Sequence, residues 1–180
     1  MEIGGVSLNK IKEMKKVSVV IVLLFIFCFG CKKTYCPAFP VELANIYFPY
    51  YEKKVLSFSD NNETHTYQIN DIYLSKEESY SKRCDCSCGA NYYFETENSQ
   101  LYGEISIGEN SSFVLFTLKI NSFAFYKEYN NINVFSVNDY SVLGDTITLN
   151  NRDGQTAILI KGKGLVSYTT ADGEEWKLVE

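Results

Sequence analysis

The sequence predicts an all-β fold, an antiparallel meander that is closed as a barrel or folded as a sandwich and that follows a cleaved signal peptide. Short runs rich in Tyr, Phe, Val, Ile and Thr recur along the chain, and these residues suit a half-buried pleated surface. Clusters of Asn, Asp and Gly, which tolerate positive φ, separate the runs. No segment of helical length repeats apolar residues every 3.6 residues. These features together favour many short strands joined by tight turns.

The predicted strands follow one another closely. In chain order they are 55–58, 64–69, 72–74, 92–96, 101–107, 113–120, 123–129, 134–137, 146–149, 156–160, 165–169 and 176–179. Asp153-Gly154 and Asp172-Gly173 predict tight hairpin turns, and Gly162-Lys163-Gly164 predicts a third turn or a bulge. Residues 41–47 allow one or two helical turns.

Residues 1–30 predict a signal peptide. Lys15 and Lys16 precede an uncharged apolar run, 17–29, which is shorter than the roughly 20 residues that a transmembrane helix needs. The run ends at Gly30-Cys31, a small residue before a cysteine. An ordinary secretory signal and an uncleaved anchor are the alternatives, and Met14 is an alternative start of translation.

This arrangement resembles the signal of bacterial lipoproteins, in which the cysteine, here Cys31, carries the lipid. The Cys-Lys-Lys start and the closing pattern of residues 162–178 are similar to those of small Bacteroidota outer-membrane lipoproteins. The resemblance implies attachment to the membrane through N-terminal acyl chains, palmitate among them. No acidic run follows Cys31, so the periplasmic face of the outer membrane is favoured over the cell surface. These families are largely uncharacterised, so the resemblance implies no activity.

The remaining chain divides into an entry segment and one domain. Residues 31–53 hold all three prolines and many aromatic residues, which predicts an extended strap packed on the domain surface. Residues 54–180 are long enough for a single β domain. The formal net charge of the chain is −5, and an acidic chain argues against nucleic acid as a partner.

The cysteines of an exported protein suggest disulfides. Besides Cys31, the exported chain holds Cys36, Cys84, Cys86 and Cys88, which allow three pairings. Our preferred interpretation joins Cys36 to one cysteine of the cluster and so clamps the strap onto the domain. A metal site built on the thiolates of the same residues is the alternative, although structural zinc sites favour wider spacing between cysteines. We expect no cofactor.

The sequence holds no convincing catalytic constellation. His65 is the only histidine and follows a polar turn, which predicts an exposed strand-end residue. The adjacent carboxylates Glu77-Glu78 and Glu174-Glu175 would point to opposite faces of a strand. We therefore expect a non-enzymatic binding or structural module whose partner is an envelope protein or a small apolar or glycan ligand. The alternative is a thiol-redox or metal-binding protein acting through Cys84, Cys86 and Cys88.

Overall fold

The computed structural model describes residues 38–80, 86–108, 113–132 and 140–179, all within one compact unit. These residues form one α-helix, α2 (Val41–Tyr47), and two 3₁₀ turns, η1 (Glu97–Ser99) and η2 (Ser141–Leu143). The strands are β1 (Val55–Ser59), β2 (Thr64–Tyr80), β3 (Cys86–Thr96), β4 (Leu101–Gly108), β5 (Phe113–Ile120), β6 (Phe123–Asn130), β7 (Thr146–Asn150), β8 (Thr156–Ile160), β9 (Gly164–Thr169) and β10 (Glu175–Val179).

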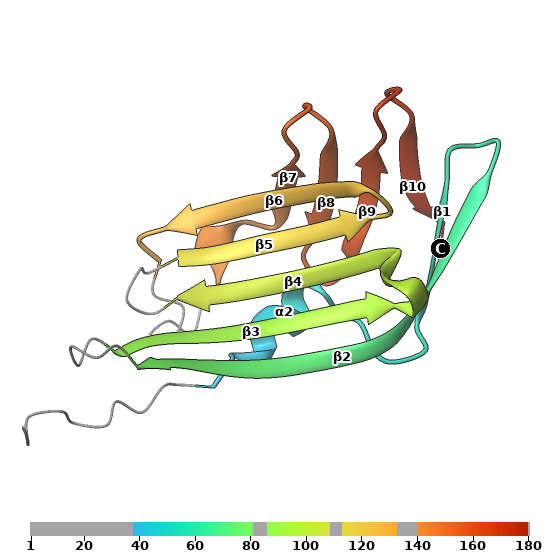
Figure 1. Cartoon of the computed structure of the whole chain (residues 1–180). Helices are drawn as coiled ribbons and strands as arrows, with labels where there is room; N and C mark the ends of the chain where they lie inside the picture. The colour runs from blue at the N-terminus through green and yellow to red at the C-terminus, as the bar shows by residue number, and fades with distance from the viewer. Residues whose placement is uncertain (1–37, 81–85, 109–112, 133–139, 180) are drawn as a thin grey trace, which may run out of the picture. The chain divides into compact units, whose positions relative to one another are not determined.

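The strands form a closed antiparallel barrel with up-and-down order (Figure 1). Each strand pairs with its neighbours in the chain, and β10 pairs with β1, with Ser57 opposite Val179. The contact between β6 and β7 is the narrowest, since it rests on one Cα pair, Tyr126 with Asn150. The all-β meander predicted from the sequence is confirmed, and of its two forms the barrel is the one observed.

Most predicted strands are found at their expected positions, with two differences. Residues 64–69 and 72–74 belong to one long strand, β2, with a bulge between Ile69 and Asp71. Strand β3 begins at Cys86, well before residue 92. The predicted strand 134–137 lies outside the described residues. The helical turns expected at 41–47 are α2, and Gly154 and Gly173 have the positive φ that their hairpin turns require.

The core lies inside the barrel because alternate residues of each strand face inward. In β4 every second residue is buried, and Ile105 and Ile107 pair with the buried Phe116 and Val114 of β5. The inward residues of β7 and β8 are also apolar. The sequence shows this period of two in β4 and β7, whereas β8 is apolar at four consecutive positions.

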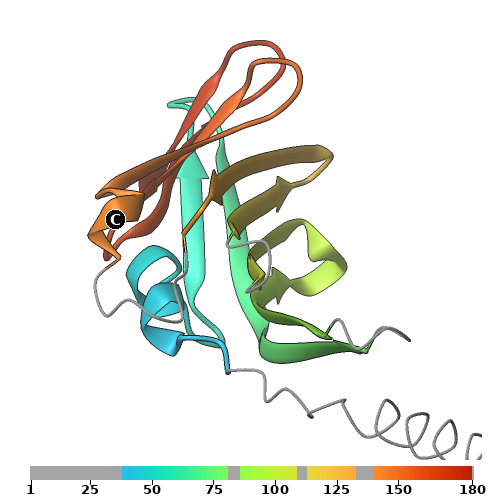
Figure 2. The same cartoon turned by 90° about the vertical axis from the view of Figure 1, so that its left-hand side faces the viewer.

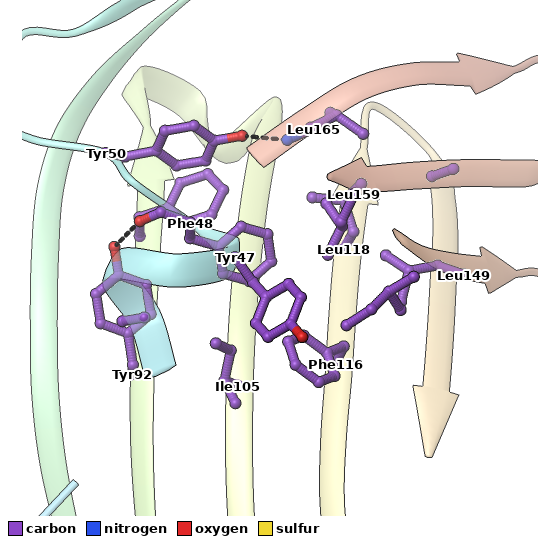
Figure 3. Close-up of a cluster of buried hydrophobic side chains, with 14 of the residues drawn as sticks. Tyr47, Phe48, Tyr50, Tyr92, Ile105, Phe116, Leu118, Leu149, Leu159 and Leu165 are labelled. Atoms are coloured by element: carbon purple, nitrogen blue, oxygen red, sulfur yellow. Dashed lines mark hydrogen bonds between the residues drawn. The ribbon is translucent and has the colours of Figure 1, made fainter. Parts of the chain in front are cut away.

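The barrel interior is filled by the chain segment that precedes β1. We call residues 39–50 the N-terminal plug. Its buried side chains are those of Phe39, Leu43, Ala44, Tyr47, Phe48 and Tyr50. Figure 3 shows the rings of the plug among inward side chains of the strands, and the Phe48 and Phe94 rings meet edge to face at 5.0 Å. The prediction of a strap on the domain surface is therefore wrong for these residues, because a barrel of this many strands leaves room inside that aromatic side chains fill.

Hydrogen bonds hold the plug in place. The hydroxyl of Tyr47 donates to the carbonyl of Gly144 at 2.6 Å, and the backbone N–H of Leu165 donates to the Tyr50 hydroxyl at 2.7 Å. The amide of Gly162 donates to the carbonyl of Ile46 at 2.7 Å. Buried polar groups of the plug thus have partners on the barrel, as a buried segment requires.

The two ends of the barrel differ. In Figure 2 helix α2 lies toward the lower end of the strands, and the hairpins β1–β2, β7–β8 and β9–β10 turn at the upper end. We call this upper end the mouth of the barrel. The plug lies in the barrel toward the end opposite the mouth (Figure 2).

Candidate ligand-binding cleft at the barrel mouth

Aromatic rings close the core at the mouth. The imidazole of His65 stacks on the indole of Trp176 with ring centroids 3.9 Å apart and an interplanar angle of 10°. The Trp176 indole is also nearly parallel to the ring of Tyr168, at 6.1 Å. Below them Phe58 meets Tyr168 edge to face at 5.4 Å. The rings of His65, Tyr168 and Trp176 form the aromatic floor of the mouth, and Phe58 packs beneath it.

Strand pairing brings these rings together. Phe58 of β1 lies opposite His65 of β2, and Trp176 of β10 lies opposite Tyr168 of β9. Directly opposed residues of an antiparallel pair share a face, and the buried Phe58 and Tyr168 show that this face is the inner one. The turns Asp60-Asn61-Asn62 and Asp172-Gly173 end the strands just beyond, so the rings lie at the rim of the core.

A cleft of about 450 Å³ opens above this floor. Its lining residues come from β2, from the β5–β6 hairpin and from the β9–β10 hairpin, and they are His65, Asn121, Phe123, Tyr168, Thr170, Ala171, Asp172, Glu174 and Trp176. The volume is within the range of about 300–1,000 Å³ for small-molecule sites, which occur often in the mouths of β-barrels.

The rim of the cleft is acidic. Its charged lining residues are Asp172 and Glu174. The Asp172 carboxylate raises the pKa of Glu174, and Asp60 and Glu63 of the neighbouring β1–β2 turn act in the same direction. The backbone amides of Glu63 and Asn62 donate to Asp60 and lower the pKa of its carboxyl. The two shifts have opposite directions, since backbone donors favour the charged form of Asp60 and neighbouring carboxylates disfavour that of Glu174.

The floor holds two polar groups, the neutral phenol of Tyr168 and the indole N–H of Trp176, which lacks a hydrogen-bond partner among the described residues. Burial raises the pKa of Tyr168, so its phenol is neutral, and its oxygen lies 3.5 Å from Nδ1 of His65. Trp176 is 4% exposed, and within the described parts of the chain its Nε1 has no hydrogen-bond partner. A buried indole N–H usually finds an acceptor, so Trp176 is the exception in this cluster.

Two of the cysteines predicted as site residues, Cys86 and Cys88, are described, and neither lines this cleft. Cys31, Cys36 and Cys84 lie outside the described residues. Cys86 and Cys88 belong to the first part of β3, and their Cα atoms are in register with those of Tyr80 and Glu78 of β2. Along such an extended strand, residues two apart are separated by roughly 6.6 Å. The lipidation of Cys31 and the pairing of the other cysteines stay predictions.

The prediction for His65 was wrong in one respect. It does lie near the start of a strand, but its ring is half-buried against Trp176 rather than free on the surface. Sequence reasoning did not select Trp176, Tyr168 or Asn121 as site residues. A signal was available, because the hairpin around Asp172-Gly173 fixes the pairing of Tyr168 with Trp176.

The described residues offer neither a metal-binding group nor a membrane-spanning helix. Within 38–80, 86–108, 113–132 and 140–179, no group of three or more His, Cys, Asp or Glu side chains is placed to hold a metal ion. None of the helices in these ranges has the length and apolar character needed to cross a membrane. Comparison with protein-family models, with curated proteins and with solved structures found no match.

Proposed function

We propose that this protein is a lipid-anchored component of the bacterial cell envelope that binds a small ligand, without catalysing a reaction, in the cleft at the barrel mouth. The observation that carries the binding role is the cleft itself, which has an aromatic floor and polar groups at its rim. The N-terminal plug already contributes its aromatic side chains to the core inside the barrel, which favours the mouth cleft over the barrel interior as the ligand site.

The chemistry of the cleft supports binding over catalysis. His65, the only histidine of the chain, is stacked on Trp176, and the hydroxyl near its Nδ1 belongs to the neutral Tyr168. Stacking fixes the imidazole as part of the floor. A general base acts on a proton within hydrogen-bond reach, and the hydroxyl near Nδ1 of His65 is that of Tyr168.

The binding role is testable through the single tryptophan of the chain. Because Trp176 lines the cleft, its fluorescence reports on this site alone. We expect compounds from a library of small amines, sugars and carboxylates to change the Trp176 emission and to raise the melting temperature. Ala171→Tyr, at an exposed lining position, should abolish both responses by filling the cleft.

Arg152→Tyr is the matched control. Arg152 precedes Asp153-Gly154 in the β7–β8 turn as Ala171 precedes Asp172-Gly173, but it does not line the cleft. Ligands that bind both variants equally well would place the binding site elsewhere and contradict the proposal.

The anchor is tested separately by mass spectrometry of the protein taken from the membrane fraction, with and without reduction. We expect Cys31 to be the acylated N-terminus and reduction to add four hydrogens, one for each of Cys36, Cys84, Cys86 and Cys88. Free or metal-bound thiols at Cys84, Cys86 and Cys88 would instead favour the thiol-redox or metal-binding function.

A further inference from the structure

We propose that the ligand of the mouth cleft is a small organic ammonium compound with an apolar body. This inference rests on the proposed function, since it names the chemical class that the same cleft binds. It follows from three properties of the cleft, namely the sign of its charge, the way in which its described carboxylates are spread and the nature of its floor.

The sign of the charge is the first property. Among the lining residues the charged side chains are the carboxylates of Asp172 and Glu174, and no lysine or arginine is present. The nearby Glu175 has an ion-pair partner, Lys177, at 3.0 Å, whereas Asp172 and Glu174 form no ion pair within the described residues. A bound cation would relieve the repulsion that raises the pKa of Glu174.

The second property separates an organic cation from a metal ion. Calcium and magnesium need several oxygen ligands converging on one point. In the described part of the chain the acidic side chains are not grouped for this, and the Asp172 carboxylate already accepts a hydrogen bond from the Thr170 hydroxyl. Carboxylates spread along a rim instead suit a cation whose charge is diffuse.

The floor is the third property. The rings of His65, Phe123, Tyr168 and Trp176 give the cleft an apolar base. Aromatic rings attract organic cations through their quadrupole, and a desolvated apolar body gains further free energy by leaving water. An aromatic floor under a carboxylate rim is therefore complementary to an ammonium group attached to an apolar body.

Choline and its neutral isostere, 3,3-dimethylbutan-1-ol, test this inference, because the two differ in charge and hardly in shape. Binding is measured by Trp176 fluorescence and by calorimetry on the mature full-length chain. We expect choline to bind at least tenfold more tightly than the isostere, and its affinity to fall with added salt. The Asp172→Asn/Glu174→Gln double variant should lose about tenfold in choline affinity.

The control removes the same charge elsewhere. Asp153→Asn/Glu128→Gln lowers the net negative charge equally at exposed positions outside the cleft, and it should leave choline binding unchanged. Equal loss in both double variants would show that overall charge, not the cleft, attracts choline, and would overturn the inference.

Three further outcomes would overturn it. If choline and the isostere bind equally, the cleft is an apolar site and the proposed function stands without the cation. If neither binds while library sugars do, the ligand is a glycan. If choline still binds the Ala171→Tyr variant, the mouth cleft is not its binding site.

Discussion

The hydroxyl of Tyr50 accepts a hydrogen bond from the backbone N–H of Leu165 at 2.7 Å, which ties the N-terminal plug to strand β9 across most of the chain. The contact is close because the residue before Leu165 is Gly164. A Cβ atom on Gly164 would lie 2.5 Å from the Tyr50 oxygen and 2.8 Å from two carbons of its ring. Because Gly164 has no side chain, the Tyr50 ring can pack directly against the backbone of β9.

Gly164→Ala should therefore destabilise the fold more than an alanine at a comparable glycine. Gly162 has a similar positive φ, but a Cβ there would meet no atom within 4 Å. Both variants incur the roughly 1–2 kcal/mol cost of a left-handed alanine, and Gly164→Ala adds about 1–3 kcal/mol for overpacking against Tyr50. Chemical denaturation of the two variants measures the difference. Equal stabilities of the two variants would show that Tyr50 can move away from the added methyl group without destabilising the fold.

The plug should behave as part of the core. Phe48 is 1% exposed and packs on Phe94 and Phe116, so Phe48→Ala should lower the free energy of unfolding by about 3–5 kcal/mol. Tyr51, three residues further along, is 65% exposed, and Tyr51→Ala is the matched control. Denaturant titration followed by circular dichroism checks both. A small effect of Phe48→Ala would mean that the barrel is stable without its plug.

The strands and turns were predictable because each signal is local. Alternating burial in β4 and β7 follows the order of apolar and polar residues, and the positive φ of Gly173 follows from its hairpin position. Closure of the barrel was not predictable, because it depends on the pairing of β1 with β10, which are at opposite ends of the domain sequence. No local sequence pattern indicates such a long-range pairing.

The plug shows a second limit of sequence reasoning. Its prolines correctly exclude a central strand, and the helical turns at 41–47 were expected. Whether such a segment lies on a sheet or inside a barrel depends on how much space the closed strands enclose. That quantity is set by strand number and tilt, and not by the residues of the segment.

The cleft was missed for a related reason. His65 and Trp176 are distant in sequence, and they meet because both β2 and β10 flank the short strand β1. The pairing of Tyr168 with Trp176 is local to one hairpin and was within reach of prediction. The stack of Trp176 on His65 required the closed barrel.

The stack of His65 on Trp176 should be visible in fluorescence. His65→Ala removes the ring 3.9 Å from the indole and lets water reach one face of it, so the emission of Trp176 should shift to longer wavelength. His65→Phe keeps a ring on that face and should give a much smaller shift. Steady-state spectra of the two folded variants provide the measurement, with circular dichroism to verify the fold. Identical shifts would mean that the ring does not shield Trp176.

Stability should decline at alkaline pH because tyrosines are buried in and around the plug. Burial raises the pKa of Tyr47 to about 12 and that of Tyr92 to about 12, against an ordinary value of 10.0. A phenol whose pKa is higher in the folded state stabilises the fold fully below pH 10, and the contribution is lost as the pH rises from 10 toward 12. The free energy of unfolding of the native protein should therefore fall across this window.

The phenylalanine variants of these tyrosines test that origin. Tyr47→Phe removes the hydrogen bond to Gly144 and should cost about 0.5–1.5 kcal/mol at neutral pH. Tyr47→Phe/Tyr92→Phe should also reduce the slope of stability against pH between 10 and 12, because two groups that must ionise on unfolding are gone. Tyr51→Phe, at an exposed position, serves as the control. A double variant with the native slope would assign the alkaline sensitivity to other groups, whereas a flatter slope would confirm that the plug and the strand facing it keep their phenols protonated within the core.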